Sequence, residues 1–220
     1  MNVTFEIVKN SPEIRTYITQ ADVSLTALGF TEHSFAHVTK CAEVAAHILT
    51  QLGYSSKEVE LAKIAAFMHD IGNVVNRHDH AISGATMAFR ILDKMGMEPA
   101  DVAAVITAIG HHDDSTAFPV NAVAAALILA DKTDVRRSRV RNNDVINFDI
   151  HDRVNYAVER SEVLLDTVSG TVTLSLTINT QVCAVMDYFE IFLQRMLLCR
   201  RAAEALELKF RLEINGQILL

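Results

Sequence analysis

The sequence contains few cysteines, prolines and glycines, and these shortages exclude several classes of protein. Its three cysteines, Cys41, Cys183 and Cys199, are odd in number and widely separated. This pattern argues against a disulfide framework and against cysteine zinc sites, so we expect reduced core residues. Three prolines and eight glycines, in a chain that is half apolar and 21% charged, are too few for a low-complexity or disordered protein. An ordinary globular protein is therefore expected.

Long apolar runs and an excess of positive charge are also missing. Each apolar stretch is interrupted by charge well before bilayer length, and the first residues, MNVTFEIVKN, lack the regions of a secretory signal. We therefore expect a cytoplasmic protein without a membrane partner. The formal net charge of −7 disfavours bulk nucleic-acid binding, although a local basic cluster can still contact a phosphate.

The first 160 residues are expected to form one helical domain. A chain of 220 residues has room for one good core and a small appended unit. From Ser11 to about Arg160, apolar residues recur mainly at helical spacing, with glycines and capping residues at the breaks. The pattern predicts a mainly α fold with helices over about 12–28, 31–52, 55–70, 81–94, 99–109 and 120–135.

Residues 161–220 are expected to form a small α+β subdomain. SEVLLDT and TVTLSLTI are rich in strand-forming residues and flank Ser169-Gly170, which predicts a hairpin. A long amphipathic helix from about Gln181 to Leu206 follows. LKFRLEI and QILL then flank Asn215-Gly216, a strong hairpin signal. The long helix could pack on the bundle or pair two subunits, so a homodimer is one expectation.

Histidine and aspartate are the most informative residues of the chain. Eight of nine histidines precede residue 113, and His69-Asp70 follows the apolar run LAKIAAFM. Asp131 follows ten residues without charge, and burying an unpaired carboxylate is costly unless it is paired or binds a metal ion. A helical bundle can bring such positions together. Nitrogen and oxygen donors without thiolate suit iron, manganese, zinc, cobalt or nickel better than calcium or magnesium.

Four segments carry a resemblance to a known family. HVTKCAEVAAHILTQLGYSSKEVELAKIAAFMHDIG, HAISGATMAF, AIGHHDD and ILADKTD, across roughly residues 30–140, resemble the HD superfamily of metal-dependent phosphohydrolases in order and spacing. The resemblance implies a helical domain whose divalent metal ligands are His37, His69, Asp70, His80, His111 and Asp131. One ion is held by the first histidine, the HD pair and the last aspartate, and Asp70 bridges to a second ion held by His80 and His111. Iron and manganese are the first expectations, with zinc, cobalt or nickel as alternatives.

Two further histidine positions remain open. His112 could donate a hydrogen bond to a ligand or bind a third ion. His33 lies one helical turn before His37 and would share its face. Because a metal-binding acid occupies a similar offset in the HD-GYP phosphodiesterases, His33 could touch a metal ion or the substrate phosphate. The other HD dipeptides, at 78–79 and 151–152, follow no apolar helix and are expected to be solvated.

The resemblance implies hydrolysis of a phosphate ester or anhydride by a metal-bound hydroxide. Asp70 and Lys132 are the candidate catalytic residues. The basic stretch after Asp131 could contact substrate phosphate, with Lys132, Arg136 and Arg137 as candidates. It could equally be a solvated face paired with nearby aspartates.

The expected substrate is a small nucleotide or dinucleotide phosphate. Asn73 follows HDIG where the HD-GYP branch carries lysine, and only Pro119 remains of its Gly-Tyr-Pro element, so cyclic di-GMP is not the first choice. Two alternatives stay open. Some HD proteins use a similar six-ligand di-iron set for oxygen-dependent bond cleavage, so this protein could be an HD-type di-iron oxygenase. It could also be a regulatory module that binds metal or nucleotide, with the α+β tail as its functional part.

Overall fold

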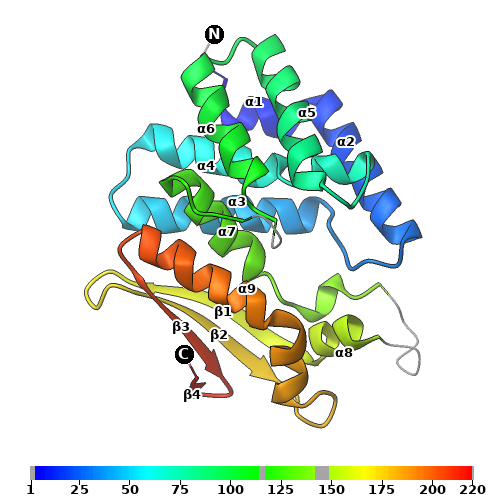
Figure 1. Cartoon of the computed structure of the whole chain (residues 1–220), viewed down its shortest axis with the longest axis vertical. Coiled ribbons are helices and arrows are strands. Elements are labelled where there is room, and N and C mark those ends of the chain that lie inside the picture. The colour runs from blue at the N-terminus through cyan, green and yellow to red at the C-terminus, as the bar shows by residue number, and fades with distance from the viewer. Residues whose placement is uncertain (1–2, 114–116, 142–148, 220) are drawn as a thin grey trace.

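Helices up to residue 132 pack into a bundle, and strands from residue 158 onward form a sheet at the other end of the molecule (Figure 1). The computed structural model describes residues 3–113, 117–141 and 149–219. The helices of the bundle are α1 (Phe5–Asn10), α2 (Pro12–Ala27), α3 (Phe35–Gln51), α4 (Ser56–Met68), η1 (Ile71–Val74), α5 (His80–Lys94), α6 (Pro99–Gly110) and α7 (Ala122–Lys132). This mainly helical fold confirms the predicted fold class.

Side-chain caps set the starts of several helices. The Ser55 hydroxyl accepts from the backbone N–H of Glu58, whose carboxylate accepts from Ser55 in return, so α4 begins with a capping box. Ser34 caps α3 by accepting from Ala36 N, three residues later than Thr31, where the predicted helix begins. The short helix α1 was not predicted; Ser11 separates it from α2.

Helix α7 lies at the centre of the bundle and packs against α3, α4 and α6. Its residues from Val123 to Ala130 are all buried, as expected for a helix that is apolar on every side. The helix ends at Lys132, earlier than the predicted 135, with Thr133 as its C-cap. Asp131 is thus delivered to the interior by the end of a buried helix.

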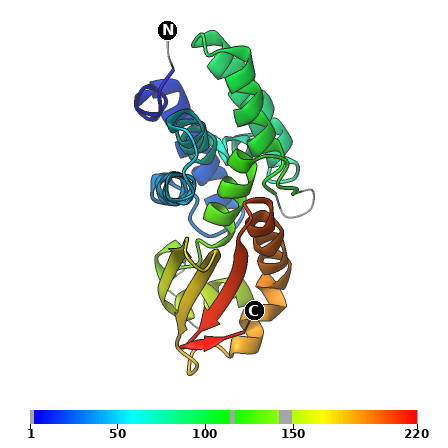
Figure 2. The same cartoon turned by 90° about the vertical axis from the view of Figure 1, so that its left-hand side faces the viewer.

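The second unit is a four-stranded sheet covered by one long helix. Strands β1 (Val158–Asp166) and β2 (Thr171–Ile178) form the predicted antiparallel hairpin. Helix α9 (Val185–Ala205) then crosses to β3 (Lys209–Ile214), which pairs parallel with β2. Asn215 and Gly216 adopt positive φ in the final turn, leading to β4 (Gln217–Ile218). Figure 2 shows α9 on one face of this sheet, and α9 also packs against α7.

The two units are joined by a segment that contains η2 (Arg137–Arg139) and α8 (Ile150–Ala157). The boundary expected at residue 160 falls inside β1, and the division into two domains stays a prediction. Helix α9 begins at Val185 and not near Gln181, because the preceding residues form a turn on the Asn179 carbonyl. The three cysteines are buried and free. Among the described helices, none is long and apolar enough to cross a membrane.

Candidate metal centre

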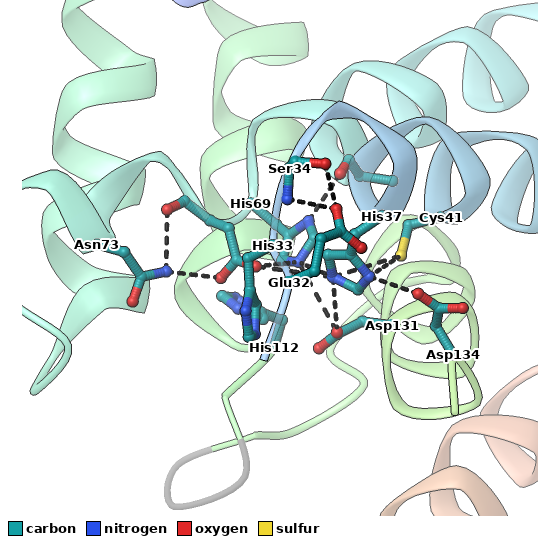
Figure 3. Close-up of polar contacts among 12 residues, drawn as sticks. Glu32, His33, Ser34, His37, Cys41, His69, Asn73, His112, Asp131 and Asp134 are labelled. Atoms are coloured by element: carbon teal, nitrogen blue, oxygen red, sulfur yellow. Dashed lines mark hydrogen bonds and ion pairs between the residues drawn. The ribbon is translucent and has the colours of Figure 1, made fainter. Parts of the chain in front are cut away.

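Side chains from five helices converge inside the bundle, and Figure 3 shows most of them in one group. Each comes from the first turn of a helix, from its last residues or from the residues just after it. The members of this group, which we call the centre, are His37, His69, Asp70, His80, His112 and Asp131. All are buried except Asp131, whose side chain is 12% exposed.

One half of the centre is formed by His37, His69 and Asp131. The Nε2 atoms of the two histidines lie 3.3 Å apart. Asp131 Oδ1 lies 3.4 Å from Nε2 of His37 and 3.8 Å from Nε2 of His69. Asp70 Oδ2 faces the same space, 3.1 Å from His69 Nε2. Two imidazoles and two carboxylates therefore surround one point.

The other half of the centre is formed by His80 and His112. Their Nε2 atoms lie 3.2 Å apart. The second oxygen of Asp70, Oδ1, lies 3.5 Å from His80 Nε2. Asp70 thus has one oxygen directed at each pair of histidines.

The hydrogen bonds of the four imidazoles define which nitrogen is free. Each Nδ1 is held by an acceptor at 2.6–3.0 Å: an Asp134 carboxylate oxygen for one ring, and backbone carbonyls for the others. With Nδ1 donating, each neutral ring presents the lone pair of Nε2. These four lone pairs and the carboxylate oxygens point at one another, which is unfavourable unless a cation lies among them. The donor set therefore fits divalent metal ions.

The pKa shifts of the two carboxylates and of His112 suit metal binding, whereas for His69 burial lowers the pKa and the Asp70 and Asp131 charges raise it above its usual value. Burial raises the pKa of Asp70, but His69, His33 and His80 together outweigh burial and hold that pKa well below the usual value. Burial also raises the pKa of Asp131. The Lys132 ammonium, 2.8 Å away, is the main group that opposes burial and holds this pKa well below the usual value. Burial lowers the pKa of His112 well below its usual value, so this ring is neutral. Ionised carboxylates and neutral imidazole are the forms that bind metal ions.

Asp134 supports the centre from behind His37. Its Oδ2 accepts from His37 Nδ1 at 2.7 Å, and its Oδ1 pairs with Lys40 and Arg136, each at 2.9 Å. The side chain is fully buried. The sequence alone predicts this aspartate only as a partner of the basic stretch. The available signal was its spacing, because it follows Asp131 by three residues and so leaves α7 on the same side.

Two further neighbours were not assigned a role from sequence. Asn73 Nδ2 donates to Asp70 Oδ1 at 2.8 Å and so fixes the orientation of that carboxylate. The Cys41 thiol lies 3.7 Å from His37 Nδ1. Burial and the Asp131 charge raise the pKa of Cys41 well above its usual value, which disfavours the thiolate. The donors of the centre remain nitrogen and oxygen.

The structure places His112 beside His80, the position assigned to His111 from the resemblance. His111 is the C-cap of α6, and its buried Nδ1 has no hydrogen-bond partner among the described residues. Successive residues at a helix end point in different directions, so an adjacent pair of histidines does not reveal which one faces inward. The geometry favours His112 as the donor.

The basic stretch is largely occupied by internal pairs. Lys132 is buried against Asp131. Arg136 pairs with Glu32 and Asp134. Arg137 donates to the Tyr156 carbonyl at 2.6 Å, and its guanidinium lies over the Tyr156 ring. The geometry thus gives these cations structural partners, and their contact with substrate stays a prediction.

His33 lies next to the centre, but it is not part of the groups whose possible ligand atoms lie within 4.8 Å of one another. Its ring centroid is 5.4 Å from that of His37, and its Nδ1 lies 2.7 Å from the Thr31 carbonyl. Burial lowers its pKa well below the usual value, so it is a neutral side chain. Contact of His33 with a metal ion or a phosphate stays a prediction.

The other HD dipeptides lie away from the centre. His78 and Asp79 pair with each other on the surface, with 86% and 70% of their side chains exposed. His151 and Asp152 lie in the first turn of α8. Arg77, which sequence analysis did not single out, lies beside the centre: its Nη1 is 3.4 Å from His80 Nε2 and 3.3 Å from Asn73 Oδ1.

The chain is similar in sequence to known proteins. Ribonuclease Y from Chloroflexus aurantiacus is 35% identical over 107 residues, which are 48% of this chain and 19% of that protein. A crystal structure of a predicted HD superfamily hydrolase from an uncultured Thermotogales bacterium has 25% identity and a TM-score of 0.43, and the alignment covers 60% of this chain and 73% of that chain. The HD domain family model matches residues 34–190. Because this match covers most of the chain, the protein belongs to the HD domain family.

Proposed function

We propose that the protein is a dinuclear metal-dependent phosphohydrolase that cleaves a phosphate ester or anhydride of a nucleotide. The position of Asp70 carries the proposal. One carboxylate oxygen faces His37 and His69, and the other faces the second pair of histidines. A carboxylate in this position suits two ions that share it.

The residues divide naturally between two ions. His37, His69, Asp70 and Asp131 would hold the first, and Asp70, His80 and His112 would hold the second. The nitrogen and oxygen donors fit iron or manganese first and zinc, cobalt or nickel as alternatives. When bound, such ions act as Lewis acids toward a phosphoryl oxygen and make bound water acidic enough to be a nucleophile near neutral pH.

The chain itself orients these ligands and excludes water from them. Asp134 and Asn73 fix the His37 ring and the Asp70 carboxylate by hydrogen bonds. Lys132 keeps Asp131 ionised through the ion pair at 2.8 Å, so its proposed catalytic contribution is exerted through that ligand. Arg77 places a guanidinium at the edge of the second half, where it can pair with a phosphoryl oxygen.

The test is metal analysis of the purified protein together with a substrate screen. Manganese-loaded or iron-loaded protein is assayed against nucleoside monophosphates, polyphosphates and phosphodiesters, with Asp70→Asn as the inactive variant and Asp93→Asn as an exposed control. We expect phosphate release or diester cleavage that requires metal and Asp70. A diester arm is included because the relative named above is a ribonuclease.

Two outcomes would replace this proposal. Oxygen consumption with an organic substrate, together with a mixed-valent iron signal and no phosphate-ester turnover, would favour an HD-type di-iron oxygenase. Nucleotide binding by the metal-loaded protein without turnover of any phosphate ester would favour a regulatory module. Metal-free protein with fully retained activity would also contradict a metal-dependent reaction.

A further inference from the structure

A cavity of about 360 Å³ lies where α8 and α9 meet the helical bundle. Its walls come from the segment after α2, from Arg77, from the region around η2, and from α8 and α9. Among its lining residues are His33 and Arg77, which also neighbour the metal centre. The cavity therefore extends from the centre toward the C-terminal unit. Its volume is within the range of pockets that bind small ligands, roughly 300–1,000 Å³.

The end of the cavity nearest the centre suits one phosphoryl group. Arg77 lies 3.4 Å from His80 Nε2 through Nη1, and its guanidinium is 5.5 Å from the Phe30 ring centroid. The other nearby arginine, Arg139, is already held by the backbone carbonyls of Glu32 and Asp134. Arg77 is thus the cation best placed to meet an anionic group at the centre.

The α8 side of the cavity carries two carboxylates at the start of that helix. Asp149 and Asp152 both line the cavity, and so does the buried amide of Asn155. Phe30 and Leu28 contribute an apolar wall with exposed fractions of 41% and 62%. An apolar wall beside hydrogen-bond acceptors suits a flat, polar organic group that carries N–H or O–H donors. The two carboxylates disfavour a second phosphate beside them, and the remaining charged side chain that α9 adds to the lining is Arg195.

We propose that this cavity binds the nucleoside part of a nucleoside monophosphate. The phosphate would lie at Arg77 and the metal centre, and base N–H groups or ribose hydroxyls would donate to Asp152 and Asp149. The inference rests on the proposed function for the phosphate end alone. It selects a mononucleotide over a dinucleoside polyphosphate, because Asp149 and Asp152 would repel a phosphate chain that passed beside them.

Binding to the full-length protein tests this assignment without requiring turnover. Adenosine, guanosine, cytidine and uridine monophosphates, inorganic phosphate and diadenosine tetraphosphate are titrated calorimetrically into the manganese-loaded protein. At least one monophosphate is expected to bind more tightly than inorganic phosphate and than the tetraphosphate. Asp152→Asn is expected to weaken that monophosphate by about tenfold, the worth of a hydrogen bond to a charged group, and to leave inorganic phosphate unchanged. Asp93→Asn is the matched control.

Phe30→Leu supplies a second variant that removes the aromatic wall, and circular dichroism checks that each variant folds. Unchanged monophosphate affinity in Asp152→Asn, Asp149→Asn and Phe30→Leu would overturn the assignment, as would tighter binding of the tetraphosphate. The two proposals fail separately. If the protein hydrolyses monophosphates and Asp152→Asn has no effect, the phosphohydrolase proposal holds and the nucleoside pocket is excluded. If monophosphate binding depends on Asp152 but no ester is hydrolysed, the nucleoside pocket holds and the phosphohydrolase proposal is excluded.

Discussion

The buried carboxylate of Asp134 accepts a hydrogen bond from Nδ1 of His37 at 2.7 Å, although the two residues are 97 positions apart in the chain. This contact fixes the ring so that Nε2 faces the centre. It also makes Nε2 a stronger electron-pair donor to a metal ion, because the carboxylate stabilises positive charge on the imidazole. Lys40 and Arg136 hold the same carboxylate from the other side, which keeps it ionised in spite of its burial.

Replacing this carboxylate is expected to weaken metal binding. We predict that Asp134→Ala lowers metal affinity by about 10–100-fold and that Asp134→Asn, which keeps an acceptor oxygen for His37, has a smaller effect. Chelator competition with manganese measures the affinity. Asp93→Asn, an exposed carboxylate on α5, is the control. Wild-type affinity in folded Asp134→Ala would show that the hydrogen bond does not support the ligand.

The sequence predicted most helices because their signals are local. The capping box at Ser55, the Asn-Gly turn at 215–216 and the apolar run before Asp131 each act within a few residues. The start of α3 was placed too early because Thr31 is as good a capping residue as Ser34 in isolation. The structure uses the Thr31 carbonyl as the partner of His33 Nδ1 instead.

Features that depend on distant parts of the chain could not be predicted. Arg136 was considered for phosphate binding, but Glu32, from the loop before α3, pairs with it at 3.1 Å. The cavity at α8 exists only because α9 packs on α7 and α8 packs on α9 and η2. The choice between His111 and His112 depends on the exact end of α6. Each case requires knowledge of packing that residue spacing does not contain.

Metal counts should follow the division of the centre into two halves. We predict that Asp70→Ala loses both ions, because its oxygens face both pairs of histidines. His80→Ala and His112→Ala should each lose mainly one. Inductively coupled plasma mass spectrometry on folded protein gives the number of ions per chain.

His111 supplies the matched control for that experiment. Because its ring lies outside the ligand groups of the described residues, His111→Ala should keep both ions. Loss of one ion in His111→Ala and none in His112→Ala would restore the assignment expected from the family resemblance. Equal loss in Asp70→Ala and His80→Ala would contradict a bridging carboxylate.

Gly72 lies where α5 approaches the residues after Asp70. A Cβ atom at this position would come within 2.0 Å of the His80 carbonyl oxygen and 2.5 Å of the Gly84 backbone nitrogen. Backbone atoms cannot move aside easily, so Gly72→Ala must displace the start of α5 and with it the His80 ring. We predict a loss of about 1–3 kcal/mol in the free energy of unfolding and a loss of metal at the second half.

Gly110 provides the comparison for this prediction. A Cβ atom there meets only the Ala85 Cβ at 3.7 Å, an ordinary contact, so Gly110→Ala should retain metal and should not be destabilised. Urea unfolding and metal analysis of both variants check the expectation. Equal stability of the two variants would show that the contact between Gly72 and α5 is not tight in solution.

If Asp152 binds a ligand, its carboxylate is expected to lower the stability of the folded protein slightly at neutral pH. The first turn of a helix favours a negative charge. Burial and the nearby Asp149 nevertheless raise the pKa of Asp152, and His151 opposes them only in part. A raised pKa means that the folded state prefers the protonated form. The carboxyl group therefore stabilises the folded state below its unfolded pKa, which is near 4. This contribution is lost as pH rises through the folded pKa. At pH 7 the charged wild type is therefore less stable than Asp152→Asn, and the difference shrinks toward pH 4.

Because the Asp152 side chain is largely solvated, the gain in Tm at pH 7 should be no more than about 2 °C. Thermal unfolding of wild type, Asp152→Asn and Asp93→Asn at both pH values measures this difference in Tm. If Asp152→Asn is less stable than wild type at pH 7, the carboxylate has a structural role in α8. A variant that is more stable but binds nucleoside monophosphates less tightly would show the trade of stability for function that is typical of binding sites.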